Sequence, residues 1–228
     1  MAHSGVLRSL VKGGYRPGVV FDVGANVGNT AGEFAATFPD AAIRAFEPVA
    51  ETYGHLVGRV GGWRGVTCHR LALGRDAGQV AMRVDGISPA NRLVGAAEKA
   101  RGVVETVERV TGDAFCAEHG IDRVGLLKID TEGHDLDVVL GFREMILGRR
   151  VDFVQVECGL ARDNDRHVTF VEAQTLMTAL GYGFFGLFDL VPRKRSGVAA
   201  AFYGNAVFVR PDLAWPVPRD GAGSPTAP

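Results

Sequence analysis

Residues 19–30 read VVFDVGANVGNT: an apolar run of strand length, a turn containing Gly24 and Gly28, and a helix that begins near Asn29. A strand, a glycine turn and a helix in this order bring backbone N–H groups and a helix N-terminus close to a ligand. The stretch therefore predicts a small-molecule site at the turn. The alternative is a plain connection that uses glycine only for its dihedral angles.

The rest of the chain repeats this alternation of strand-length apolar runs and helical patterns, which is typical of an α/β fold with a mostly parallel sheet buried on both faces. The expected strands are 18–23, 42–46, 66–71, 79–84, 124–129, 151–156, 182–190 and 201–209, and the expected helices are 29–38, 111–119, 134–147 and 168–180. The last two strands have too short a connector for a crossover helix, so we expect an antiparallel hairpin at the sheet edge. Residues 79–84 alternate between larger apolar side chains and polar or small ones, and they are predicted to form an antiparallel strand that interrupts the parallel pattern, which we call the antiparallel excursion.

We expect a single domain over residues 18–210, preceded by a helical segment over 1–17. Residues 211–228 are dominated by Pro, Gly, Ala and Ser, which predicts a disordered tail. Residues 86–102 show no clear period and form a candidate lid.

The composition excludes several classes of protein. At 228 residues, with 46% hydrophobic and 22% charged residues, the chain is neither collagen-like, nor intrinsically disordered, nor a disulfide scaffold. A formal net charge of −1 provides no field to attract nucleic acid or an anionic membrane, so neither a nucleic-acid partner nor membrane insertion is expected. The three cysteines lack C-x-x-C spacing, which favours reduced thiols and a cytoplasmic location. The sequence does not indicate the oligomeric state.

Glu47 is the second sign of a nucleoside site. It ends the strand after the glycine turn, where doubly wound folds place an acid that accepts the ribose hydroxyls. The alternative is a solvated acid at the start of a helix. Asp22, just before the turn, is a candidate to orient the loop amides or to accept from a ligand's ammonium group, or else a structural anchor.

The loop also indicates which nucleoside it binds. The dinucleotide fingerprint G-x-G-x-x-G needs glycine where this chain has Asn26 and Asn29. Hydrogen-bonding side chains there suit a ligand without pyrophosphate, such as S-adenosylmethionine. An NAD(P)-dependent oxidoreductase is the first alternative, and a partner module of the same fold that has lost its activity is the second.

Five ordered blocks of sequence resemble the FkbM family of class I S-adenosylmethionine-dependent methyltransferases. They are FDVGANVG at 21–28, AFEP at 45–48, LALG at 71–74, and TGD at 111–113 followed by LKIDTEGHD at 127–135. The resemblance covers roughly residues 7–211, and Asp135 stands where many members have glutamate.

This resemblance implies a Rossmann-like sheet of about seven strands with the last strand antiparallel and helices on both faces. It also implies methyl transfer to oxygen, commonly a hydroxyl of a sugar, a glycan or a secondary metabolite. The cofactor-binding residues that we expect are Asp22, Gly24, Asn26, Gly28, Glu47, Pro48, Ala72, Leu73 and Asp130.

Methyl transfer to a hydroxyl needs alignment and a base that removes the proton. Ligands of such sheets bind at the carboxyl ends of the strands, which selects Asp130, His134 and Glu157 as catalytic candidates. The alternative to a catalytic role for His134 is that it is only a polar residue at the start of a helix. A second alternative is a divalent metal held by Asp130 and Glu157, with Glu132; we do not expect this metal.

The remaining polar residues are assigned to recognition or to structure. Acceptor recognition is expected from the loops 86–102, with Asn91 and Arg92, and 159–167, with Arg162 and Arg166. Residues 193–195 (Arg-Lys-Arg) are expected to be a solvated turn rather than a phosphate site. Lys128 lies inside an apolar strand and is expected to reach a carboxylate, while Asp113 is expected to cap the helix that it begins.

Overall fold

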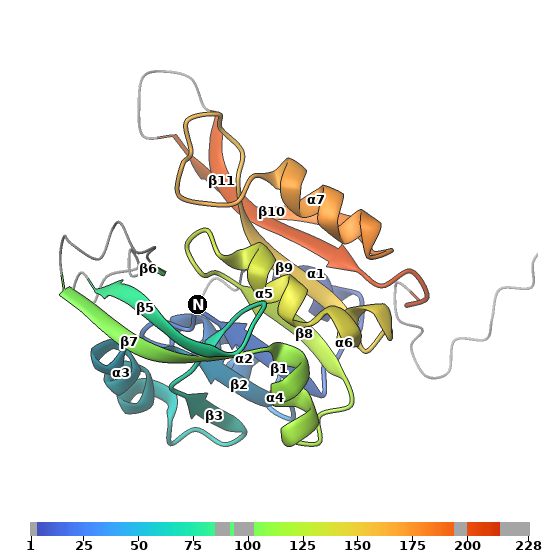
Figure 1. The fold of residues 1–228 in the computed structure, drawn as a ribbon. Helices are drawn as coiled ribbons and strands as arrows, with labels where there is room; N and C mark the ends of the chain where they lie inside the picture. The colour runs from blue at the N-terminus through green and yellow to red at the C-terminus, as the bar shows by residue number, and fades with distance from the viewer. Residues whose placement is uncertain (1–3, 85–91, 94–102, 194–199, 215–228) are drawn as a thin grey trace, which may run out of the picture.

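The structure of the chain is a computed structural model that describes residues 4–84, 92–93, 103–193 and 200–214. Its main feature is a seven-stranded sheet of order β10-β11-β9-β8-β1-β2-β3 (Figure 1). The strands are β1 (Val19–Val23), β2 (Ala42–Phe46), β3 (Val66–His69), β8 (Val124–Ile129), β9 (Val151–Gly159), β10 (Gly183–Pro192) and β11 (Ala201–Val209). β11 pairs antiparallel with both β9 and β10, and the other pairs in this sheet are parallel. The predicted α/β class, the seven strands and the antiparallel last strand are confirmed.

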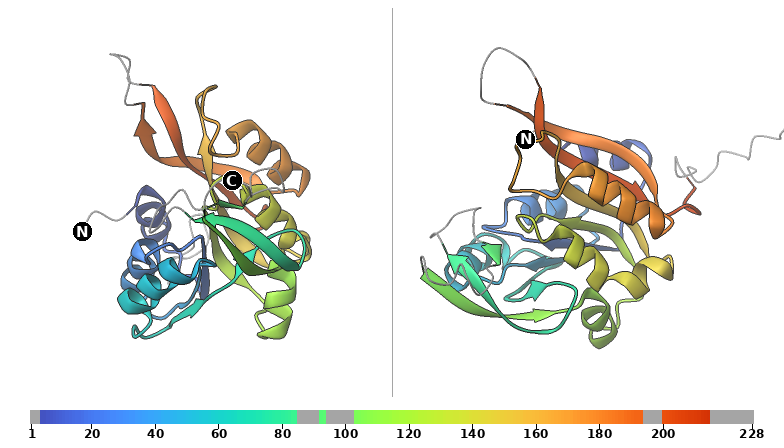
Figure 2. Two further views of the ribbon diagram at one scale, coloured as in Figure 1. Left: turned by 60° about the vertical axis from the view of Figure 1, so that its left-hand side comes forward. Right: turned by 45° about the horizontal axis from the view of Figure 1, so that its top comes forward.

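Helices cover both faces of this sheet (Figure 2). They are α1 (Gly5–Lys12), α2 (Asn29–Thr37), α3 (Ala50–Val60), α4 (Gly112–Glu118), α5 (Asp135–Gly141), α6 (Arg143–Leu147) and α7 (Phe170–Ala179). One apolar core lies between the sheet and α1, α2 and α3, and a second lies between the sheet and α4 to α7. In β1, Val20 packs into the first core and Phe21 into the second, so both faces of the strand are buried. This explains why the central strands read as continuous apolar runs.

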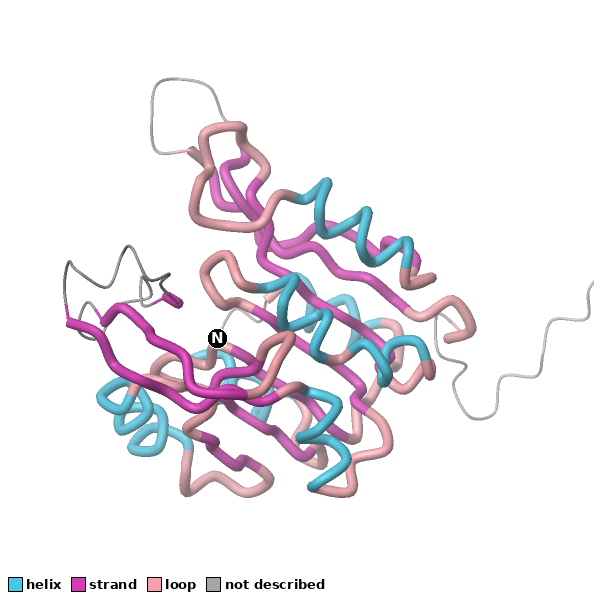
Figure 3. The backbone as a smooth tube through the Cα atoms, in the orientation of Figure 1, coloured by secondary structure: helices cyan, strands magenta, loops and turns pink. Residues whose placement is uncertain are grey.

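A second sheet of four strands lies beside the first (Figure 3). Its order is β4 (Ala72–Leu73), β7 (Val103–Val110), β5 (Gly78–Val84) and β6 (Arg92–Leu93). The predicted antiparallel excursion is confirmed, because β5 pairs antiparallel with β7. The Glu105 carboxylate ties this sheet to α3 by accepting the backbone N–H of Ala50 at 3.1 and 3.2 Å.

Several predicted boundaries were wrong. The expected helix 134–147 is two helices, α5 and α6, that meet at Phe142. The Asp113 carboxylate accepts two backbone N–H groups in the first turn of α6 at 2.8 and 2.9 Å, so it caps α6, while Thr111 caps α4. The expected strand 66–71 ends at His69, β9 continues to Gly159, β7 was not predicted, and the helix expected to start near Glu47 is α3, for which no bounds were predicted. Burial by neighbouring elements, which a local pattern does not encode, decided these boundaries.

Other expectations fall partly or wholly outside the described residues. These include most of the candidate lid 86–102, Lys194 and Arg195, and most of the tail. The division into 1–17, 18–210 and 211–228 stays a prediction, although α1 buries Val6, Leu7 and Leu10 in the core. Among the helices of the described chain, none has the length and apolar character needed to span a membrane.

Candidate active site

A pocket opens at the carboxyl ends of β1, β2 and β8. Its open space, including the solvent at its mouth, is about 730 Å³. Of the residues predicted for the site, these line it: Gly24, Asn26, Glu47, Pro48, Ala72, Leu73, Asp130 and His134. Phe46, Leu71 and Met82 add apolar wall, and Thr131 and Glu132 add polar wall. Asp22, Gly28 and Glu157 lie outside this lining.

The glycine loop shapes one side of the pocket. Gly24 has a φ of +75°, and a Cβ there would lie 1.9 Å from the carbonyl oxygen of Asp130, so only glycine lets β1 and β8 end this close together. Gly28 also has a positive φ, +85°, and a Cβ there would lie 2.9 Å from the Leu56 side chain. Gly24 thus belongs to the pocket, while Gly28 serves the packing of α2 against α3.

Glu47 forms a fixed, buried carboxylate in the pocket wall. Its side chain accepts the backbone N–H of Asn26 at 3.2 Å and that of Val49 at 3.0 Å. Burial raises the pKa of Glu47 to about 7, although both hydrogen bonds act to lower it. Each carboxylate oxygen still has lone-pair capacity for a ligand donor.

Lys128 and Asp22 form a buried ion pair beneath the loop. The Lys128 Nζ lies 2.9 Å from Asp22 Oδ1 and 3.4 Å from Asp130 Oδ2, and it donates to the carbonyl of Gly24 at 3.3 Å. Burial raises the pKa of Asp22, and Lys128 offsets part of that rise. The expectation that Lys128 reaches a carboxylate is confirmed. Asp22 supports the loop from below and is fully buried, which matches the structural anchor among its predicted roles.

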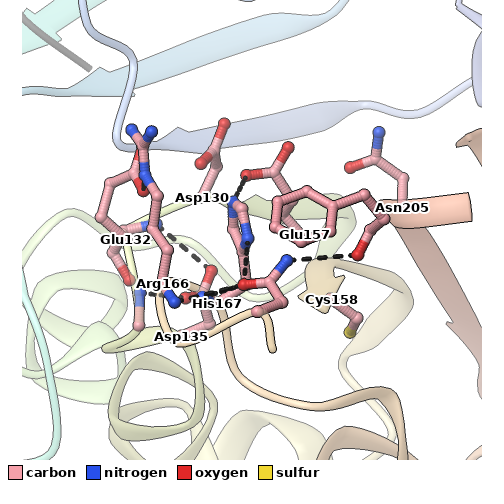
Figure 4. A network of polar contacts seen from close by, with 12 residues as sticks. Asp130, Glu132, Asp135, Glu157, Cys158, Arg166, His167 and Asn205 are labelled. Atoms are coloured by element: carbon pink, nitrogen blue, oxygen red, sulfur yellow. Dashed lines mark hydrogen bonds and ion pairs between the residues drawn. The ribbon is translucent and has the colours of Figure 1, made fainter. Parts of the chain in front are cut away.

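A second polar group joins the pocket through Asp130. The Asp130 carboxylate lies near Glu157 and acts to raise the pKa of Glu157, and the Glu157 Oε2 lies 2.9 Å from the His167 Nε2. Arg166 pairs with Glu132 through both of its carboxylate oxygens. Figure 4 shows His167 pointing toward Glu157, with Arg166 alongside Glu132. The pocket and this group therefore form one continuous site.

His134 is separate from this group. It begins α5 at the pocket wall, and its Nδ1 lies 3.8 Å from Asp137 Oδ2, beyond hydrogen-bond distance. The geometry is thus compatible with both roles predicted for His134, contact with a ligand and a polar start of the helix.

Sequence reasoning missed Asp135, Asn164 and His167. The buried Asp135 accepts the backbone N–H groups of Thr131 and Gly133, each at 3.2 Å, and burial raises its pKa to about 7. It thereby holds the turn on which the Glu132 side chain enters the pocket. Asp135 could have been predicted from its place in the block LKIDTEGHD. His167 is the last residue of the loop 159–167, for which the sequence predicted a role only in acceptor recognition.

Among the described residues, His, Cys, Asp and Glu side chains form no group of three or more that could hold a metal ion.

The family model described as Methyltransferase FkbM domain matches residues 22–184. Hexuronic acid methyltransferase AglP of Haloferax volcanii is 27% identical over 153 residues, which are 67% of this chain and 60% of that protein. Methyltransferase 1 of Beauveria bassiana is 27% identical over 184 residues, 72% of this chain and 71% of that protein.

Solved structures share the fold. The FkbM methyltransferase of Methylobacillus flagellatus superposes with a TM-score of 0.54 at 14% identity, over 85% of this chain and 43% of that one. Magnesium protoporphyrin IX methyltransferase of Synechocystis, solved with bound S-adenosylmethionine, gives 0.51 at 12% identity, over 90% and 76% of the two chains. The chain thus spans less than two thirds of the length of AglP and of the Methylobacillus protein.

Proposed function

This chain belongs to the FkbM methyltransferase domain family, and from that premise we propose that it is an S-adenosylmethionine-dependent O-methyltransferase acting on a hydroxyl of a sugar, a glycan or a secondary metabolite. The observation that carries the proposal is the charge of the pocket. Its charged lining residues, within the described part of the chain, are Glu47, Asp130 and Glu132, with no lysine or arginine among them.

An acidic pocket favours a cationic ligand over an anionic one. S-adenosylmethionine carries a sulfonium and an ammonium group, whereas NAD carries a diphosphate, and no lysine or arginine among the described lining residues could pair with that diphosphate. Asn26 stands where a dinucleotide site needs a glycine for the approach of the pyrophosphate. Both observations favour the methyl donor over the nicotinamide alternative.

The pocket also offers a partner for each part of the donor. Glu47 is placed to accept the ribose hydroxyls, and Phe46, Leu71, Ala72 and Leu73 offer apolar wall for the adenine. Asp130, held by Lys128, provides a carboxylate for the ammonium group. The loop amides and these carboxylates are held by the protein before a ligand binds, which lowers the cost of ordering on binding.

The bound donor supplies a methyl group that is already activated for displacement. The protein must therefore align the acceptor and take its proton. The hydroxyl oxygen gains the methyl carbon, the electron pair of the broken bond stays on sulfur, and the hydroxyl proton passes to a carboxylate. We assign this proton to the pair Asp130 and Glu157, with His134 as the remaining candidate.

The acceptor class rests on two supports. One relative is named for a hexuronic acid, a hydroxyl-rich sugar. The loop 159–167 and the group around Asp130 and Glu157 offer closely spaced donors and acceptors, as a polyhydroxylated ligand requires. We further propose that the reaction is cytoplasmic and needs no divalent metal.

Calorimetric titration with S-adenosylhomocysteine tests the cofactor. Wild type should bind it, and Glu47→Ala should lose about 1.5–3 kcal/mol, roughly ten- to a hundredfold in affinity, because a charge-assisted hydrogen bond is lost. NAD is the control ligand, and Glu51→Ala, at an exposed acid on α3, is the control variant. No binding, or preferential binding of NAD, would reject the proposal.

An acceptor screen then tests the reaction. The full chain is incubated with labelled S-adenosylmethionine and a panel that includes methyl glucuronides, methyl hexosides and phenolic alcohols, and label transfer is located by mass spectrometry. Transfer to a hydroxyl supports O-methylation. Cofactor binding without transfer to any class would support the inactive-module alternative.

A further inference from the structure

His167 lies between two hydrogen-bond partners that both accept. Its Nε2 is 2.9 Å from Glu157 Oε2, and its Nδ1 is 3.0 Å from Asn164 Oδ1. The orientation of the Asn164 amide follows from its other bonds, because its Nδ2 donates to the carbonyl of Phe202 at 3.2 Å. Its Oδ1 also accepts the backbone N–H groups of Arg166 and His167, at 3.2 and 3.1 Å.

This arrangement determines which ring nitrogen carries hydrogen. Because Asn164 Oδ1 can only accept, the His167 Nδ1 must donate to it. The Nε2 then faces a carboxylate oxygen at hydrogen-bond distance, and that contact is favourable only if a proton lies between them. His167 and Glu157 together therefore hold one proton more than a neutral imidazole beside a free carboxylate would.

We propose that His167, oriented by Asn164, is a positioning residue that controls the proton and the charge of Glu157, and so prepares Glu157 to receive the acceptor's proton. This inference rests on the proposed methyl transfer. With the shared proton on His167, Glu157 is an ionised carboxylate beside Asp130 and has an oxygen left to accept a hydroxyl proton.

The surroundings support this role. The His167 ring stacks on Tyr203 at 4.7 Å between centroids and 26° between planes, which holds its orientation. Asp130, Glu132 and Arg166 are the other charged groups that face the pair, from the end of β8, the turn after it and the loop before α7. Burial lowers the pKa of His167, but the contact with Glu157 raises this pKa by more than burial lowers it, so the net shift is upward. Burial raises the pKa of Glu157, and the His167 contact offsets part of that rise.

Nitrogen NMR of the full chain tests the pair without needing turnover. Long-range ¹H–¹⁵N spectra report the tautomer and the titration of each of the six histidines. The His167 signals are identified by their loss in His167→Gln, or through their own Cβ correlations should that variant fail to fold. We expect hydrogen on Nδ1, titration above the ordinary histidine range, and a midpoint at least one pH unit lower in Glu157→Gln. An unchanged midpoint in Glu157→Gln, or hydrogen only on Nε2, would overturn the inference.

Kinetics with an acceptor found in the screen test the positioning role. His167→Gln should lower kcat at least tenfold and shift the acidic limb of the pH profile, with KM and the affinity for S-adenosylhomocysteine unchanged. His55→Gln, at an exposed position on α3, is the matched control. An unchanged kcat and pH profile in His167→Gln would overturn the inference. A wild type that does not bind S-adenosylhomocysteine would instead refute the proposed function, and the NMR result would still decide the pair.

Discussion

Replacing Lys128 with methionine should destabilise the protein more than any exposed charge substitution. The Lys128 Nζ lies 2.9 Å from Asp22 Oδ1 and 3.4 Å from Asp130 Oδ2. Asp22 is fully buried and Lys128 is 5% exposed, so water cannot replace the lost ammonium group. Methionine has a similar length and no charge, which leaves the packing of β8 largely intact.

The expected cost follows from this burial. Removing one partner of a buried ion pair costs about 3–5 kcal/mol, because the other charge stays buried and uncompensated. The double variant Asp22→Asn with Lys128→Met should recover most of this loss, since it buries no net charge. Burial already raises the pKa of Asp22, and loss of Lys128 raises it further. A carboxyl whose folded-state pKa lies above its unfolded value favours folding at low pH, so the loss in Lys128→Met should be smallest below about pH 4 and grow as the pH rises.

Urea unfolding followed by circular dichroism at pH 4, 6 and 8 measures these free energies. The control is Arg75→Met, which breaks an ion pair of 2.7 Å with Asp137 whose side chains are 57% and 37% exposed. Such a pair contributes about 0–1 kcal/mol. A loss below about 1 kcal/mol in Lys128→Met at pH 8, or an equal loss in the double variant, would refute the reasoning.

Three further predictions concern the pocket. Gly24→Ala should abolish S-adenosylhomocysteine binding in calorimetry, since its Cβ would lie 1.9 Å from the Asp130 carbonyl; wild-type affinity would contradict this. Wild type should lose stability in urea as the pH rises from about 4 to 7, and Asp135→Asn should lose less, because burial raises the pKa of Asp135 to about 7 and its protonated form favours the folded state; equal pH slopes would refute this. Methyl transfer found in the screen should survive exhaustive chelation, and loss that Mg²⁺ restores would favour the metal alternative.

Much of the fold was predictable because it depends on local patterns. The strand, glycine turn and helix around Gly24 predicted the first parallel unit, and the short connector before Ala201 predicted the antiparallel hairpin. Of the four-stranded sheet, the sequence predicted strand β5 but not its partner β7. Every second residue of β5 (Val80, Met82 and Val84) joins one apolar cluster, as the alternating sequence predicted. Its partner β7 lies outside the main sheet and follows a stretch without period, so the pairing of β5 with β7 could not be predicted.

The candidate site divides in a similar way. Residues at the strand ends, such as Glu47 and Asp130, were predicted because parallel strands end at one edge of a sheet. Residues on connecting loops were not, because a loop's path is set by what it packs against. His167 is 10 residues beyond Glu157 in the chain, and only the return of the loop places the two side chains 2.9 Å apart.

The sequence by itself determined the order of elements, the position of the glycine loop and the acids at the strand ends, since these follow from periodicity and from the dihedral freedom of glycine. Only the tertiary structure decided what each charged group does. It placed Asp22 beneath the loop with Lys128, Asp113 on a helix other than its own, and His167 against Glu157. The physical reason is that the charge state and role of a polar group depend on burial and on partners brought together by long-range packing, and neither is a property of local sequence.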